Sequence, residues 1–460
     1  MPKSSDIRVI DAQLYILPVE LRVPLKFGSQ VVTSVKCARV RVRVQTKDGA
    51  EAEGWGETPL SVAWVWPSDL SYEEREDRLL EFCRVSGKAL MDSDLSGHPM
   101  EIGIDFISEF LPRLKADEGV EYEEDASMPY LAALVAFSPY DIALHDAFGN
   151  LHGQGVFTML GKEWLNRDLS YYLEPSEVFR GSYPEDYLVS GSERIPVWHL
   201  VGGLDPLEES CLQGDEPDDG YPVLLRDWIR KDGLKCLKVK LRGTDLNWDY
   251  QRLERIGHIA AQEGVDWLSA DFNCTVTDPS YVNEVLDRLQ RDEADAYSRL
   301  LYVEQPFPYD LSANQIDVTS VSARKPLYMD ESAHDWSYVS LGKSLGWTGV
   351  ALKTCKTLSG ALLSLCWARQ HEMGLMVQDL TNPMLAQLPH VQLARYAGTI
   401  MGVESNGMQF YPEASLPEAK IHPGLFKREN GHLDLSSLGS AGFGYRAGEI
   451  ERELPSRIPL

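Results

Sequence analysis

Five short apolar runs in the second half of the chain end in charged side chains. Three consecutive runs end in carboxylates, and the runs before and after them end in lysines. The residues are Lys238 and Lys240, then Asp271, Glu304 and Asp330, and finally Lys353. Three carboxylates that meet at one place repel one another unless a cation joins them. An all-oxygen set of ligands suits Mg²⁺ or Mn²⁺ better than Zn²⁺.

Lysines on either side of such a metal would supply proton transfer. The positive charge of the metal favours the neutral amine and lowers the lysine pKa toward the range useful for a general base. Removal of the proton next to a metal-bound carboxylate requires such a base, and the metal would stabilise the resulting enediolate. A single Asp, Glu or Lys at a strand end is more often a cap or a solvated group. The same position on five successive runs favours an active site.

From about Ile195 to residue 410 the chain repeats one unit, a β-rich run followed by an amphipathic helical segment. The β-rich runs are residues 195–200, 234–241, 265–273, 299–307, 326–332, 349–355, 374–380 and 399–405. Such repeats fit a closed (β/α) barrel better than an open doubly wound sheet, and no Gly-x-Gly-x-x-Gly motif follows a run. The carboxyl ends of barrel strands meet at one mouth, so we expect the charged residues to converge there.

Lys238 and Lys240 are two residues apart, so both side chains point to the same face of a strand. Lys240 lies about 6.6 Å further toward the mouth, where substrate would bind. We therefore predict that Lys240 is the base and Lys238 an electrostatic helper.

The first part of the chain has a different pattern. Residues 7–60 alternate like antiparallel strands with a turn at Asp48-Gly49, and residues 71–151 are helical in pattern around an acidic run at 121–125. We expect an α+β capping domain at residues 1–165, a barrel at 190–410 and a segment at 411–460 that returns to the cap. The acidic residues 215–220 lie in a long connection and indicate a surface insertion.

The composition of the chain limits the kinds of molecule that it would bind. The chain has 44 Lys and Arg against 70 Asp and Glu, a formal charge of -26, which argues against nucleic acid or an anionic membrane. The start of the chain lacks the apolar region of a signal peptide, and no run resembles a membrane span, so we expect a cytoplasmic protein. Seven cysteines without a Cys-x-x-Cys pair, and ten scattered histidines, argue against zinc and for buried thiols.

Several motifs resemble those of the enolase superfamily, in the mandelate racemase and muconate lactonizing enzyme group. The matching segments are Gly-Trp-Gly-Glu-Thr at 54–58, the helical stretch 138–154, 159–162, Lys-Val-Lys at 238–240, Asp-Phe-Asn at 271–273, Val-Glu-Gln-Pro-Phe at 303–307, Met-Asp-Glu-Ser at 329–332 and 352–360. The resemblance implies a modified (β/α)7β TIM-type barrel under a capping domain. It also implies Mg²⁺ ligands at Asp271, Glu304 and Asp330.

The resemblance further implies that Lys240 and Lys353 are acid/base groups on opposite faces of the substrate, with Lys238 near its carboxylate. Lys-x-Lys on the second run, and the absence of histidine from residues 377–380 on the seventh, resemble the muconate lactonizing subgroup. Its known activities are cycloisomerisation, o-succinylbenzoate synthesis, dipeptide epimerisation and N-acylamino acid racemisation. The last run, 402–406, lacks the Asp-x-Asp associated with dipeptide epimerases, and residues 358–360 replace a common Gly-Gly.

Substrate contacts in this fold come from the cap and the last strands. The candidates are Trp64, Asn273, Gln378, Asp379, Glu404 and Asn406. A tryptophan such as Trp64 is more often a packing residue than a substrate contact. Asp379 and Glu404 would favour a substrate whose distal group is polar or cationic.

We therefore predict a Mg²⁺-dependent isomerase, with Mn²⁺ as an alternative ion, that acts on a small carboxylate as a racemase, epimerase or cycloisomerase. We also expect a homo-oligomer. Two alternatives stay open. An acid-sugar dehydratase would use the same enolate but would need an acid for the leaving group, and a metal-binding scaffold protein would have lost turnover.

Overall fold

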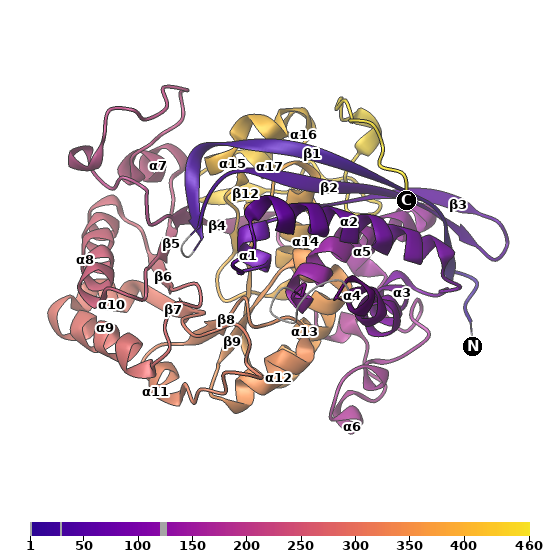
Figure 1. The fold of residues 1–460 in the computed structure, drawn as a ribbon, viewed down its shortest axis with the longest axis horizontal. Coiled ribbons are helices and arrows are strands. Elements are labelled where there is room, and N and C mark those ends of the chain that lie inside the picture. Colours follow the sequence, from indigo (N-terminus) through magenta and orange to yellow (C-terminus); the bar gives the residue numbers. More distant parts are fainter. Residues whose placement is uncertain (1, 28–29, 120–126) are drawn as a thin grey trace.

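The computed structural model describes residues 2–27, 30–119 and 127–460, so the acidic run at 121–125 lies outside the described residues. A long antiparallel sheet with its own helices lies beside a curled parallel sheet that is ringed by helices (Figure 1). The first corresponds to the predicted cap and the second to the predicted barrel.

Three antiparallel strands form the cap sheet in the order β1-β2-β3. They are β1 (Ile7–Phe27), β2 (Gln30–Thr46) and β3 (Glu51–Pro59). The predicted turn at Asp48-Gly49 joins β2 to β3, and Gly49 has a φ of 92°, which glycine adopts without strain. Val40, Val42 and Val44 are fully buried, as the alternation predicts.

The helix α5 (Tyr130–His152) crosses the cap sheet at very close range. A Cβ atom at Gly54 would lie 2.1 Å from the backbone N of Ala147, and one at Gly56 would lie 2.0 Å from the backbone O of Pro139. The glycines of the Gly-Trp-Gly motif therefore let the helix and the sheet pack together. The other cap helices are α1 (Val62–Val65), α2 (Tyr72–Asp92), α3 (Pro99–Asp105) and α4 (Leu111–Gly119), with a π-helical turn at Phe106–Phe110.

Eight parallel strands form the second sheet, and each overlaps one predicted β-rich run. They are β4 (Arg194–Val201), β5 (Cys236–Lys240), β6 (Trp267–Asp271), β7 (Leu300–Glu304), β8 (Leu327–Met329), β9 (Gly349–Leu352), β10 (Gly374–Val377) and β11 (Val403–Glu404). The order is β10-β9-β8-β7-β6-β5-β4-β11, and the sheet curls until β10 and β11 are in contact. The predicted fold class, a TIM-type barrel with an α+β capping domain, is confirmed.

Helices cover the outside of the curled sheet (Figure 1). They are α7 (Leu225–Asp232), α8 (Leu246–Glu263), α9 (Pro279–Asp292), α10 (Ala294–Arg299), α11 (Thr319–Ser322), α12 (Trp336–Ser344), α13 (Leu358–Gln370) and α14 (Gln387–Ala397). The acidic insertion precedes α7, and its Asp219 pairs with Arg22 of β1 at 2.6 Å. The insertion therefore contacts the cap hairpin.

An aromatic layer fills the barrel below its mouth. Trp198, Tyr302 and Tyr328 are buried there against one another. Gly374 makes room for the layer, because a Cβ atom at this position would lie 1.9 Å from Tyr328 Oη. The layer forms a floor beneath the carboxyl ends of the strands.

The last part of the chain contacts both domains. It contains α15 (Gly407–Phe410), α16 (Leu416–Ile421), α17 (Pro423–Phe426) and β12 (His432–Asp434), and a single turn, α6 (Ser176–Phe179), precedes the barrel. β12 pairs with β4, and the backbone N of Ile458 donates to the backbone O of Leu14 over 2.8 Å. The domain boundaries at residues 165, 190 and 411 stay predictions.

All seven cysteines are free thiols, and five of them are buried. Within the described ranges, no helix combines the length and the apolar character needed to cross a membrane.

Candidate active site

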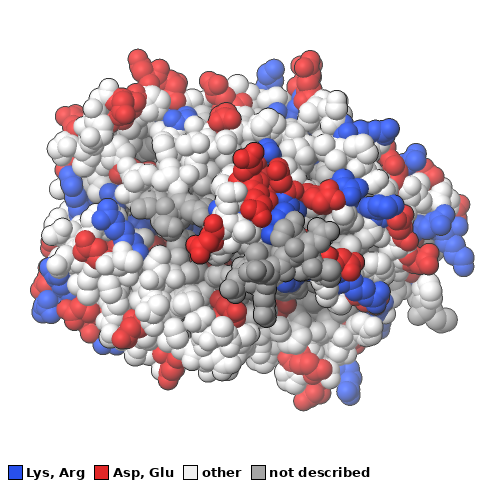
Figure 2. Space-filling view, viewed as in Figure 1, with Lys and Arg blue, Asp and Glu red and all other residues white. Residues whose placement is uncertain are grey.

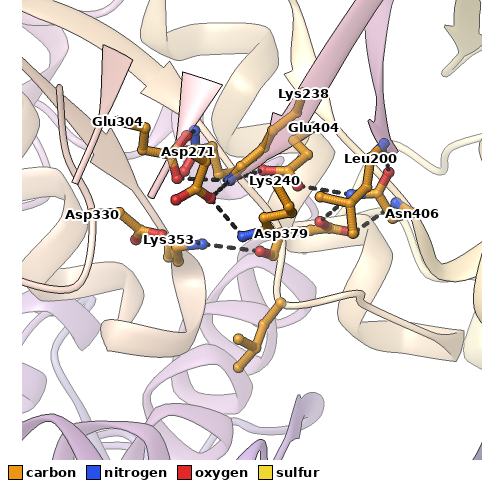
Figure 3. Close-up of polar contacts among 12 residues, drawn as sticks. Leu200, Lys238, Lys240, Asp271, Glu304, Asp330, Lys353, Asp379, Glu404 and Asn406 are labelled. Carbon is orange, nitrogen blue, oxygen red and sulfur yellow. Dashed lines mark hydrogen bonds and ion pairs between the residues drawn. The ribbon is translucent and has the colours of Figure 1, made fainter. Parts of the chain in front are cut away.

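Six charged residues lie together at the mouth of the barrel (Figure 3). They are Lys238 and Lys240 on β5, Asp271 at the end of β6, Glu304 at the end of β7, Asp330 directly after β8 and Lys353 directly after β9. None of the six residues is more than 7% exposed. In the sheet order, β5 and β9 flank the three strands that carry the carboxylates, so the lysines approach from two sides.

Lys238 is held by three carboxylates. Its Nζ lies 2.7 Å from Glu304 Oε1, 3.1 Å from Asp271 Oδ2 and 3.1 Å from Glu404 Oε2. Burial alone would lower the pKa of Lys238, but the attraction of Glu304, Glu404 and Asp271 outweighs it and raises the pKa well above its usual value. Lys238 is therefore a persistent cation in this arrangement.

Lys240 and Lys353 each contact one carboxylate of the site. Lys240 Nζ lies 2.5 Å from Asp271 Oδ2, and Lys353 Nζ lies 3.1 Å from Asp330 Oδ2. Lys353 also donates to the backbone O of Asp379 over 3.0 Å. Burial acts to lower the pKa of Lys353, yet the charge of Asp330 outweighs it and leaves the pKa raised. The sequence predicts a lowered lysine pKa only for the site with a metal bound, so that expectation stays a prediction.

The carboxylates show the electrostatic cost of their proximity. The pKa of Glu304 is well above its usual value, first because the side chain is buried and then because Asp271, Asp330 and Glu404 repel its charge. A cation among these oxygens would relieve that cost, so the donor chemistry fits Mg²⁺ or Mn²⁺. In the part of the chain that the structure describes, however, no three His, Cys, Asp or Glu side chains already surround a common point for a metal. The predicted ligand set therefore stays a prediction.

A cavity of about 20 Å³ lies among the charged groups. Its lining residues are Trp64, Leu200, Lys238, Lys240, Asp330, Lys353, Asp379, Leu380, Thr381 and Glu404. This volume holds about one water molecule. Side chains around the cavity must therefore move to admit a larger molecule, and Trp64 is the lining residue that comes from the cap.

Of the predicted substrate-contacting residues, Trp64, Asp379 and Glu404 line the cavity, whereas Asn273, Gln378 and Asn406 are not among its lining residues. Asn406 Nδ2 donates to Glu404 Oε1 over 2.8 Å and to Asp379 Oδ1 over 3.1 Å. These bonds occupy oxygens of both acids, so their predicted preference for a cationic substrate group stays a prediction.

The other two amides support the charged residues in the same way. Gln378 Nε2 donates to Glu304 Oε2 over 2.6 Å, and Asn273 Nδ2 donates to Glu331 Oε1 over 3.0 Å. In this structure both amides donate to carboxylates.

Two further residues of the site were not predicted. Gln305 Oε1 accepts from the backbone N of Asp330 over 2.7 Å and from Ser332 Oγ over 2.8 Å, so it holds the end of β8. Lys356 is buried with its Nζ 3.4 Å from Asp330 Oδ1.

The backbone at the mouth is unusual, which explains why strand alternation does not predict these contacts. Positive φ angles occur at Asn273 (46°), Cys274 (63°), Gln305 (31°), Thr357 (70°) and Thr381 (52°). Such conformations are costly for residues other than glycine and cluster at functional sites. They turn the residues that follow a strand away from the directions that its alternation sets.

Comparison with known proteins finds a family model that matches part of the chain. Residues 222–449 match the family described as enolase C-terminal domain-like. An aromatic dipeptide epimerase of Herpetosiphon aurantiacus is 25% identical over 253 residues. This alignment covers 54% of the present chain and 66% of the relative, just under two thirds of its length.

Solved structures share the fold over nearly the whole chain. A dipeptide epimerase from Enterococcus faecalis, complexed with Mg and the dipeptide L-Leu-L-Tyr, has a TM-score of 0.62 at 16% identity, with 95% of this chain and 99% of that chain covered. A muconate lactonizing enzyme from Pseudomonas fluorescens, complexed with muconolactone, has a TM-score of 0.60 at 15% identity, with 95% and 96% covered. At these identities the likeness establishes the fold and leaves the subgroup open.

Proposed function

We propose that this chain is a Mg²⁺-dependent racemase or epimerase, because residues 222–449 match the family described as enolase C-terminal domain-like. It would move the proton next to the carboxylate of a small substrate. The observation that supports this most directly is the position of Lys240 and Lys353. Both line one cavity, and they reach it from β5 and from the end of β9, on either side of the strands that carry the carboxylates.

The two lysines would act in turn. One takes the proton from one face of the substrate carbon, and the other, as an ammonium group, returns a proton to the opposite face. The pair inverts the stereocentre because each lysine serves one face. Lys238, held by three carboxylates, would keep a fixed positive charge beside the enediolate.

Asp271, Glu304 and Asp330 would hold the metal ion. When bound, Mg²⁺ would neutralise the substrate carboxylate and so make the neighbouring proton more acidic. Gln378 would keep the Glu304 carboxylate oriented, and Gln305 would fix the backbone that carries Asp330.

Dipeptides or N-acylamino acids are the proposed substrates. The named relatives include dipeptide epimerases, and Leu200 and Leu380 give the cavity an apolar wall that a side chain of an amino-acid derivative could contact. A dehydratase would need a further acid beside the leaving group. The paired lysines favour transfer of one proton between two faces.

Hydrogen exchange in D₂O tests the proposed function. We expect the wild-type enzyme to exchange the hydrogen next to the carboxylate in both stereoisomers of its substrate. Lys240→Ala should lose exchange from one stereoisomer and Lys353→Ala from the other. If neither variant loses exchange, the lysines are not the bases. Acid sugars belong in the same screen, because conversion to 2-keto products would establish the dehydratase instead.

Calorimetry tests the metal site separately. Glu304→Gln removes a proposed ligand, and we expect it to abolish measurable Mg²⁺ binding. Glu331→Gln removes the same charge one residue from Asp330 and should weaken binding by less than about tenfold, because charge alone acts through a partly screened interaction. If Glu304→Gln binds Mg²⁺ with the same affinity as wild type, Glu304 is not a ligand.

A further inference from the structure

Trp64 belongs to the cap but lies at the barrel mouth. It is part of α1, directly after β3, and is 7% exposed. Its side chain lines the cavity together with Lys240, Asp330 and Lys353. A cap residue thus forms one wall of a site whose charged groups all come from the barrel.

The indole N–H fixes the ring to the barrel. Trp64 Nε1 donates to Glu331 Oε1 over 3.0 Å, and Asn273 Nδ2 donates to the same oxygen over 3.0 Å. Glu331 is 5% exposed, so this acceptor is shielded from water. A buried hydrogen bond to a carboxylate is among the stronger polar contacts and sets the orientation of the ring.

The face of the indole covers two lysines. Lys353 Nζ lies 5.1 Å and Lys356 Nζ 5.7 Å from the ring centre, both within the range of cation–π attraction. The same two ammonium groups hold Asp330, at 3.1 Å from Oδ2 and 3.4 Å from Oδ1 respectively. One aromatic ring therefore backs the two cations that lie on this carboxylate.

We propose that Trp64 is a positioning residue that holds the ammonium group of Lys353 in place from the cap side. Lys240 is held differently, by Asp271 on β6. The cap therefore controls the lysine on one side of the site and leaves the other to the barrel. This inference rests on the proposed function only where exchange kinetics are used to test it.

Replacement of the ring gives the first test. Trp64→Leu removes the aromatic face, whereas Trp64→Phe keeps a face and loses the N–H. Trp64→Leu should slow exchange by about tenfold from the stereoisomer that Lys353→Ala abolishes, and by less than about twofold from the other stereoisomer. Trp64→Phe should recover most of the loss. Trp64→Met serves in place of the leucine variant if that variant does not fold.

Trp66 supplies the matched control. It is two residues further along, is 1% exposed and packs in the cap with the Arg78 guanidinium 4.6 Å from its ring centre. Trp66→Leu removes a buried indole of the same size, and we expect it to change exchange from the two stereoisomers by the same factor. An equal loss from both stereoisomers in Trp64→Leu as well would reduce Trp64 to a general support of the cap and overturn the proposal.

Amine labelling provides a readout that does not need turnover. A neutral acylating reagent, followed by mass spectrometry, measures the reactivity of Lys353 and Lys240 in the same sample. Trp64→Leu should label Lys353 about tenfold faster than wild type and Lys240 within about twofold, while Trp64→Phe stays near wild type. Equal acceleration of both lysines, or of neither, contradicts the proposal. If wild type exchanges no substrate hydrogen, the proposed function fails and labelling alone decides the role of Trp64.

Discussion

Lys238 and Lys240 are the same residue type on the same face of β5, yet their surroundings differ. Lys238 contacts three carboxylates and is 2% exposed, whereas Lys240 pairs with Asp271 and is 7% exposed. A fixed charge beside an enediolate need not titrate, whereas a base must release its proton. The surroundings therefore support the roles predicted from sequence position, with Lys240 as the base and Lys238 as the electrostatic helper.

Arginine substitutions separate the two roles. Lys238→Arg keeps the charge, so we expect measurable activity to remain. Lys240→Arg should lower the exchange rate at least about 10²-fold, because guanidinium does not deprotonate near neutral pH. The measurement is isotope exchange at saturating Mg²⁺, with circular dichroism to verify folding. Loss of exchange in Lys238→Arg with retention in Lys240→Arg would reverse the assignment.

The limits of sequence-based prediction are visible at individual residues. The alternation of β5 and the ends of β6 and β7 predict which charged side chains reach the mouth. Gln305 escapes prediction because it occupies left-handed backbone, and Lys356 because it lies beyond the strand, directly before the left-handed Thr357, where strand alternation no longer applies. The closure of Asp379 and Glu404 onto Asn406 depends on two loops meeting, and no local pattern encodes that contact.

The seam between α5 and α13 shows how two elements far apart in sequence are joined. Ser359, in the first turn of α13, donates through Oγ to Asp141 Oδ1 over 2.6 Å and through its backbone N to Oδ2 over 3.0 Å. His145 Nε2 lies 3.0 Å from the same hydroxyl. All three are buried, so the cap helix is bonded to the start of a barrel helix without competition from water.

Ser359→Ala should therefore destabilise the protein by about 1–3 kcal/mol, because Asp141 and His145 lose a buried partner. Urea unfolding gives the free energy of unfolding. A double-mutant cycle with Asp141→Asn isolates the pair, and we expect a coupling energy of at least about 0.5 kcal/mol. Additive effects of the two substitutions would show that the seam does not depend on this bond.

Element positions are better predicted in the barrel than in the cap. Each of the eight β-rich runs overlaps one strand, because buried parallel strands are short apolar runs bounded by polar residues. The helical stretch at 71–151 is interrupted, since the chain leaves helical backbone at Ser93 and turns until His98-Pro99 starts a new helix. Apolar periodicity continues through such turns and does not mark them.

At the scale of the whole molecule, acidic and basic side chains are interspersed over the face shown in Figure 2, on a protein with a net charge of -26. The predicted absence of nucleic-acid and membrane partners and the predicted homo-oligomer stay predictions.

Inside the protein, one buried acid connects three segments that are distant in sequence. Asp146 on α5 accepts from the backbone N of Trp55 in β3 and from that of Phe443 near the end of the chain, each over 2.9 Å.

Asp146 should make the stability of the whole molecule depend on pH. Burial raises its pKa to about 7, against an ordinary value of 3.8, although the three hydrogen bonds from Phe443, Trp55 and Asn150 act to lower it. Between these values Asp146 holds a proton in the folded protein that it releases in the unfolded chain, so the stability that this group contributes is greatest at low pH and falls as pH rises toward 7. The slope from this group is at most about 1.4 kcal/mol per pH unit. Asp146→Asn cannot titrate, so between pH 3.8 and about pH 7, the window set by the two values, its unfolding free energy should fall less steeply than that of wild type. The amide also loses an acceptor, which lowers stability at every pH and leaves the slope as the decisive quantity. Parallel urea-unfolding curves for the two proteins across this window would show that the proton is not held on Asp146.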